Sequence, residues 1–149
     1  MNNIILCHGS FDLIHIGHIR MLRWARTLLP DARLVVSLTA DAYFPEYKGE
    51  GRPAFPESVR AEWLGAIRVV DEVRIVRDLT GVPIIKELQP AIYAKGHEAE
   101  GVMMDEVNAV WEYGGRVAYM PQETPSGKQV YSSGRILSGE YWRERCKKA

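Results

Sequence analysis

Two histidines, His15 and His18, stand three residues apart near the start of the chain, with Gly9 before them and Gly17 between them. They follow a short apolar run and precede an amphipathic one, an order that predicts a strand, a glycine-containing turn and a helix start. The N-terminus of a helix exposes unpaired N–H groups and a partial positive charge, and therefore binds phosphate. We expect both imidazoles to face one point above the first helical turn, where they could stabilise charge during phosphoryl or nucleotidyl transfer. The two glycines would relax φ and let the backbone approach a ligand closely.

The same residues admit two other interpretations. The histidines could be hydrogen-bonded only to the backbone of a turn, and their spacing does not exclude this, because a short motif is only a hypothesis. Together with His8 and Asp12 they could form a metal site, but the spacing of the four residues matches no zinc pattern. Asp12 is better interpreted as a structural carboxylate that caps N–H groups of the turn.

The composition is that of a single globular domain, residues 1–149. Lys and Arg together number 19, as do Asp and Glu, and 46% of the residues are hydrophobic. The absence of a global basic field disfavours a nucleic-acid partner. Cys7 and Cys146 lie at opposite ends of the sequence, so no structural disulfide is expected. We find neither a signal peptide nor a run long enough to span a membrane, which predicts a cytoplasmic protein without membrane contact.

Hydrophobic patterning predicts strands that alternate with helices along the whole chain. The expected strands cover residues 3–8, 33–39, 72–77, 91–94 and 116–120, and the expected helices cover 17–29, 57–68, 82–88, 104–113 and 132–145. This alternation predicts an α/β fold with a doubly wound, five-stranded parallel sheet. Ligands of such sheets bind outside the carboxyl ends of the strands, where the candidate residues of this chain fall. A long loop punctuated by glycine and proline, residues 41–56, is interpreted as functional or mobile.

Residues 9–18 read Gly-Ser-Phe-Asp-Leu-Ile-His-Ile-Gly-His and closely resemble the signature of the nucleotidylyltransferase superfamily. The resemblance implies a Rossmann-like nucleotidylyltransferase fold over the chain. It also implies that the matching histidines, His15 and His18, contact the nucleotide triphosphate and stabilise the pentacovalent α-phosphate. The nucleotide site would further include Gly9, Ser10, Phe11 and Gly17.

Two basic residues are implied by the resemblance to hold the phosphate of the second substrate. Lys48 lies in the long loop, where related enzymes carry a lysine, and is assigned a catalytic role with the two histidines. Arg60 follows a segment, residues 52–60, that resembles sugar-phosphate nucleotidylyltransferases, in which the matching arginine belongs to the substrate phosphate site. The alternatives are a solvated loop lysine and a surface arginine in a salt bridge.

Two later segments complete the implied nucleotide site. Lys95 and Gly96 resemble the Lys-Gly of bacterial heptose-1-phosphate adenylyltransferases near the nucleotide base, although His97 departs from the usual glycine or aspartate. Ser132 and Ser133 resemble the serine-rich motif that opens the last helix, where hydroxyl and N–H groups would hold the β- and γ-phosphates. An ordinary N-cap serine is the alternative. Glycerol-3-phosphate cytidylyltransferases carry an arginine shortly before this motif, where this chain has only a lysine.

These residues predict an enzyme that transfers AMP or CMP from ATP or CTP to a phosphorylated small molecule, with release of pyrophosphate. The resemblance favours a sugar 1-phosphate such as heptose 1-phosphate, with Mg²⁺ bridging the nucleotide phosphates and a possible homodimer by analogy. A cytidylyltransferase for glycerol phosphate or phosphoethanolamine and an FAD synthetase are alternatives within the class. A nucleotide-binding sensor without turnover is the alternative from another class, and a metal hydrolase is disfavoured.

Overall fold

A computed structural model describes residues 2–44, 48, 51–122 and 132–139. Several predicted features lie outside the described residues, namely loop residues 45–47 and 49–50, Lys128, Cys146 and the end of the predicted last helix. Within the described part, the elements alternate as predicted, and no described helix is long and apolar enough to cross a membrane.

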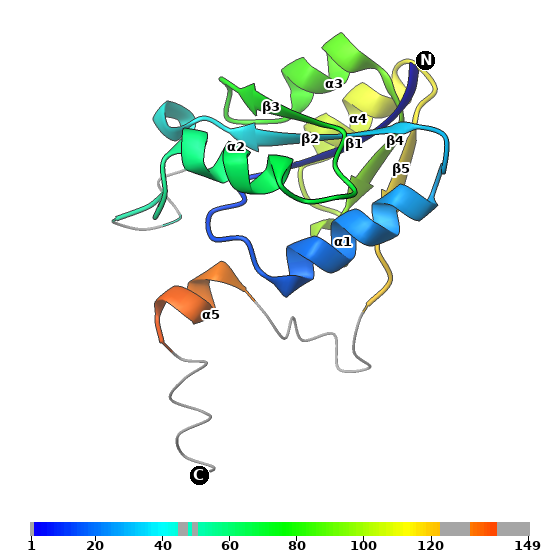
Figure 1. Ribbon diagram of the computed structural model, residues 1–149. Coiled ribbons are helices and arrows are strands. Elements are labelled where there is room, and N and C mark those ends of the chain that lie inside the picture. The colour runs from blue at the N-terminus through cyan, green and yellow to red at the C-terminus, as the bar shows by residue number, and fades with distance from the viewer. Residues whose placement is uncertain (1, 45–47, 49–50, 123–131, 140–149) are drawn as a thin grey trace.

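Five parallel strands form one sheet in the order β3-β2-β1-β4-β5 (Figure 1). Their bounds are Asn2–Gly9 for β1, Arg33–Thr39 for β2, Glu72–Val76 for β3, Pro90–Lys95 for β4 and Arg116–Tyr119 for β5. At the centre, Leu6 of β1 pairs with Val35 of β2 on one side and with Tyr93 of β4 on the other. The strand order reverses between β1 and β4, which places a topological switch point at the carboxyl end of β1.

Helices cover both faces of the sheet, as Figure 1 shows. The α1 helix, Ile16–Thr27, and the α2 helix, Glu57–Gly65, pack on one face over a core that includes Ile5 and Cys7. The α3 helix, Val82–Leu88, and the α4 helix, Met104–Trp111, pack on the other face over Ile4 and Leu6. Side chains of β1 therefore alternate between two buried layers, which confirms the predicted doubly wound fold. Cys7 is a buried core residue, as expected.

Three short helices complete the described elements. The 3₁₀ helices η1, Asp41–Tyr43, and η3, His97–Ala99, follow β2 and β4. The α5 helix, Ser133–Leu137, lies beside the start of α1 (Figure 1). The described α5 helix ends at Leu137, and Gly139 with φ +70° stands in the left-handed conformation that is common at helix ends. Residues 140–145 of the predicted helix lie outside the described residues.

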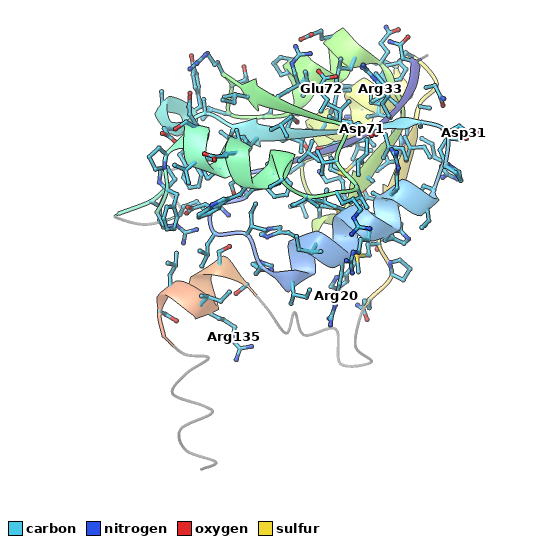
Figure 2. All side chains as sticks on the ribbon, in the orientation of Figure 1. Arg20, Asp31, Arg33, Asp71, Glu72 and Arg135 are labelled. Carbon is cyan, nitrogen blue, oxygen red and sulfur yellow. The ribbon has the colours of Figure 1, made fainter. Side chains whose placement is uncertain are left out.

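Charged contacts hold the amino ends of the strands, away from the carboxyl ends where ligands bind. Asp71 accepts a hydrogen bond from the backbone N–H of Leu34 at 2.7 Å and pairs with Arg26, and Arg33 pairs with Glu72 at 3.2 Å (Figure 2). Because Asp71 receives these hydrogen bonds, its pKa lies below the ordinary value although burial opposes the shift. These residues join α1, β2 and β3 and serve the fold.

Candidate active site

A cavity of about 720 Å³ opens at the carboxyl ends of the strands. It brings together most of the residues predicted for the site, namely Gly9, Ser10, Phe11, His15, His18, Lys48, Lys95, Gly96, Ser132 and Ser133. Gly17 and Arg60 do not line it, and the reasons follow below. The residues come from four segments separated in the sequence, so the parallel sheet is what assembles them.

His15 and His18 form the N-terminal cap of α1. The Nδ1 atom of His15 accepts the backbone N–H of Gly17 at 3.1 Å, and the Nδ1 atom of His18 accepts the backbone N–H of His15 at 3.3 Å. The two rings lie against each other, tilted by 31°, with centroids 3.9 Å apart. A ring nitrogen that accepts a hydrogen bond carries no proton, so each neutral imidazole carries its proton on Nε2. The turn and ligand interpretations are thus compatible, because Nδ1 caps the helix while the rings line the cavity.

His18 is a neutral hydrogen-bond donor at physiological pH. Burial, followed by the nearby His15 and Lys48, lowers the pKa of His18 to about 3. The ring of Phe11 packs against His18 with centroids 5.2 Å apart and contributes to this burial. Positive charge at this end of the cavity therefore comes from Lys48 and from the helix terminus, while His18 contributes a directed N–H group.

The backbone of the signature is strained at residues other than its glycines. Gly17 lies in the first turn of α1 and donates its N–H group to the cap, and its predicted place in the nucleotide site stays a prediction. Phe11 and Leu13 have φ values of 47° and 70° and so adopt the left-handed conformation that was expected of glycine. Gly9 instead leaves space for the Phe11 ring, because a Cβ atom at Gly9 would lie only 3.3 Å from that ring. Such strain is typical of loops held for a ligand.

The start of α5 is tied directly to this loop. Ser133 donates from Oγ to the carbonyl of Leu13 at 2.9 Å, a contact between residues 120 positions apart in the sequence. Ser132 caps α5 and accepts the backbone N–H of Arg135 at 3.3 Å, as an N-cap serine does. Arg135 itself extends from the side of α5 away from the sheet (Figure 2). Both serines line the same cavity as the two histidines.

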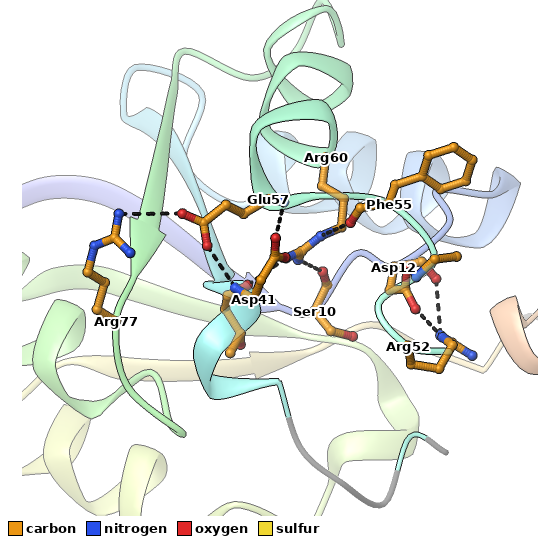
Figure 3. A network of polar contacts seen from close by, with 10 residues as sticks. Ser10, Asp12, Asp41, Arg52, Phe55, Glu57, Arg60 and Arg77 are labelled. Carbon is orange, nitrogen blue, oxygen red and sulfur yellow. Dashed lines mark hydrogen bonds and ion pairs between the residues drawn. The ribbon is translucent and has the colours of Figure 1, made fainter. Parts of the chain in front are cut away.

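Arg60 is a structural residue, in contrast to its predicted contact with an acceptor phosphate. Its side chain is completely buried, and its guanidinium donates to the carbonyls of Phe55 at 3.0 Å, Ser10 at 2.5 Å and Thr39 at 2.9 Å (Figure 3). It also pairs with Asp41 at 2.6 Å. The guanidinium therefore holds the backbone of two cavity residues, Ser10 and Thr39, from behind.

Asp12 holds the other end of the long loop. Its buried carboxylate accepts the backbone N–H of Ala54 at 2.7 Å and pairs with Arg52, so it has a structural role, but the N–H group that it caps belongs to the long loop and not to its own turn (Figure 3). Arg60 contacts Asp41 at the start of the loop, and Asp12 contacts Arg52 near its end. Lys48 is thus carried to the cavity by a loop anchored at both ends.

A buried polar cluster that sequence analysis missed forms the opposite wall of the cavity. Glu106 of α4 accepts hydrogen bonds from Lys95 Nζ, from the Tyr93 hydroxyl and from the backbone N–H of Gly81, each at 2.7 Å. Burial alone would raise the pKa of Glu106, but Lys95 and the other donors outweigh it, so the pKa lies below the ordinary value. Nothing in the sequence distinguishes Glu106 from any other acidic residue in a first helical turn.

His8 belongs to the same wall. Its Nδ1 atom lies 2.9 Å from the hydroxyl oxygen of Ser37, and burial lowers its pKa, so the ring is neutral. The sequence suggested His8 only as part of an improbable metal site. Among the described residues, no group of three or more His, Cys, Asp or Glu side chains is arranged to hold a metal ion.

Comparison with known proteins identifies the class. The cytidylyltransferase-like family model matches residues 6–127, so the chain belongs to the cytidylyltransferase-like family, and the predicted class of nucleotidyltransferases is confirmed. Among individual relatives, the bifunctional protein HldE of Pelobacter propionicus is 42% identical over 116 residues, and that of Geobacter metallireducens is 39% identical. Each alignment covers 76% of this chain but only 23% of the relative. The chain thus spans about a quarter of the length of these relatives.

Solved structures confirm the fold. A lipopolysaccharide core biosynthesis protein from Thermoplasma volcanium superposes with a TM-score of 0.65 at 22% identity, covering 79% of this chain and 95% of that one. A pantothenate synthetase from Thermus thermophilus superposes with a TM-score of 0.60 at 14% identity, covering 89% of this chain and 60% of that one. These likenesses show a shared Rossmann-like architecture, as the sequence predicted.

Proposed function

We propose that this domain transfers a nucleotidyl group from ATP or CTP to a phosphorylated small molecule and releases pyrophosphate. An oxygen of the acceptor phosphate attacks the α-phosphorus, and the bond from that phosphorus to the bridging oxygen breaks. Pyrophosphate leaves with the electron pair of this bond, and no covalent enzyme intermediate forms. The observation that carries the proposal is the pair of adjacent histidine rings at the start of α1, which line a cavity together with Lys48, Ser132 and Ser133.

Each group has a role set by its position. His15 and His18 donate from Nε2 to the triphosphate, with His18 near the bridging oxygen, where negative charge develops. Lys48 neutralises the acceptor phosphate and draws it toward the α-phosphorus. Ser132 and Ser133 hold the departing pyrophosphate at the start of α5. Catalysis then consists of positioning and charge stabilisation.

The Mg²⁺ ion belongs with the nucleotide in this proposal. Asp12, the carboxylate in the signature, is occupied by Arg52 and by the N–H of Ala54. The described residues offer no ligand set of their own, so the phosphate oxygens would hold the ion and bring it to the site as part of the substrate. Its chemistry is to offset charge on the triphosphate.

The sequence resemblance to heptose-1-phosphate adenylyltransferases supports a sugar 1-phosphate as the acceptor. Gly96 follows β4 and lines the cavity, at the position where the resemblance places the nucleotide base. Glycerol phosphate, phosphoethanolamine and flavin mononucleotide are the alternative acceptors. A homodimer and a cytoplasmic location stay predictions.

Pyrophosphate release is the test. The protein is incubated with Mg²⁺ and either ATP or CTP, against sugar 1-phosphates, glycerol 3-phosphate, phosphoethanolamine and flavin mononucleotide. We expect release with one nucleotide and one acceptor class, and its loss in His18→Ala. The matched control is His97→Ala, since His97 does not line the cavity. Tight nucleotide binding without release for any acceptor would contradict the proposal and favour a nucleotide sensor.

A further inference from the structure

We propose that His8, Lys95 and Glu106 form a hydroxyl-binding floor that recognises the uncharged polyol part of the acceptor. The inference rests on the proposed function and deepens it, because it names the part of the acceptor that the protein recognises and the residues that bind it. All three side chains line the cavity, and the proposed function assigns none of them to the triphosphate.

The floor lies on the α3 and α4 face of the sheet, whereas the catalytic histidines lie at the start of α1 on the other face. Cys7 and Ala94 pack in the core beneath α1 and α2. Because side chains alternate along a strand, their neighbours His8 and Lys95 face α3 and α4, where Glu106 meets Lys95. The cavity thus has one side at the start of α1, where the proposed function places the triphosphate, and a second side formed by the floor.

The charges of the floor suit hydroxyl groups better than a phosphate. Lys95 Nζ lies 2.7 Å from Glu106, so the two charges offset each other, and His8 is kept neutral by burial. A phosphate placed here would meet the Glu106 carboxylate as well as the ammonium group. Hydroxyl groups both donate and accept, and therefore match a floor that offers both kinds of group.

The floor retains hydrogen-bonding capacity toward the cavity. Among the described residues, Lys95 donates only to Glu106, although an ammonium group has three N–H donors. His8 uses Nδ1 with Ser37, and no hydrogen bond of Nε2 is found within the described part of the chain. Glu106 Oε1 accepts a single hydrogen bond, from Gly81. These unused donors and acceptors are therefore available to a ligand in the cavity that all three residues line.

The floor is held rigidly, as a specificity site requires. A Cβ atom at Gly81 would lie 2.9 Å from His8 and 3.1 Å from Glu106, so the two side chains pack tightly against the start of α3. The Tyr93 hydroxyl fixes Glu106 from behind. An acceptor whose hydroxyl groups differ in position would lose hydrogen bonds here, because the floor cannot rearrange to follow it.

Calorimetric titration tests the floor apart from turnover. The probes are glucose 1-phosphate, mannose 1-phosphate, glycerol 3-phosphate and inorganic phosphate, each added to protein saturated with ATP or CTP. Glu106→Gln and His8→Asn remove a charge and a cavity-facing nitrogen respectively, and His8→Asn keeps a polar group toward Ser37. His97→Asn is the matched control. Nucleotide affinity and thermal unfolding report on the fold of each variant.

We expect both variants to bind the best organic phosphate at least about tenfold more weakly, with nucleotide and inorganic phosphate affinities within about twofold of the wild-type values. The inference is overturned if the wild-type protein binds none of the three organic phosphates at millimolar concentration. It is equally overturned if variants that still bind nucleotide keep their organic phosphate affinity, or if inorganic phosphate or nucleotide affinity falls in parallel. If sugar phosphate binding behaves as expected while pyrophosphate is never released, the proposed function fails and the floor stands.

Discussion

Replacing Arg60 by methionine tests whether this residue positions the backbone around the cavity or contacts the substrate itself. The substitution keeps an unbranched side chain of similar length but removes a buried guanidinium that donates to three carbonyls and pairs with Asp41. The side chain of Asp41 is 39% exposed, so water can replace its partner. The carbonyls of Ser10, Thr39 and Phe55 lose charge-assisted hydrogen bonds, and we expect a loss of roughly 3–5 kcal/mol in the free energy of unfolding.

Urea denaturation followed by tryptophan fluorescence measures this loss. A domain of this size has a total stability of about 5–15 kcal/mol, so the variant should remain folded in dilute buffer but unfold at markedly lower urea. Arg60→Lys keeps the charge but not the planar fork and should lose about half as much. Arg77→Ala is the control in the same network, because the Arg77 side chain is 67% exposed and its loss should cost less than about 1 kcal/mol.

The opposite pattern would refute the reasoning. If Arg60→Met left the unfolding free energy within about 1 kcal/mol of the wild-type value and raised only the KM for the acceptor, Arg60 would contact the acceptor phosphate. The buried position seen in Figure 3 would then not be its functional one.

Three further predictions concern the cavity. Because the pKa of His18 is about 3 when folded and near 6.5 when unfolded, the unfolded state binds more protons between these values, and stability should fall as pH drops through this window. Urea unfolding at pH 7 and pH 5 should show a smaller decline for His18→Gln than for the wild-type protein, and equal declines would contradict the shifted pKa. Gly81→Ala should lower the melting temperature, because its Cβ would meet His8 at 2.9 Å, whereas Gly65→Ala, with its nearest contact at 4.0 Å, should not. Ser133→Ala should raise the KM for the nucleotide about five- to tenfold, and an unchanged KM would remove Ser133 from the phosphate site.

Local sequence patterns were sufficient for the features that depend on neighbouring residues. The strand over residues 33–39 and the helix over residues 82–88 have the predicted bounds. The three-residue spacing of His15 and His18 predicted two imidazoles at one helix start, and an N-cap serine at the last helix was among the alternatives considered. Strand alternation then predicted the edge of the sheet at which these residues meet, because parallel strands end together.

The tertiary structure decided what depends on residues distant in the sequence. Arg60 matches a phosphate-binding pattern in its own segment, but its guanidinium is buried and donates to the carbonyls of Ser10 and Thr39, which are distant in the sequence. Glu106 has no local signal, and its contact with Lys95 arises only when α4 packs against β4. Burial and partner geometry set the charge and direction of a polar group, and these are long-range properties that residue type and spacing do not specify.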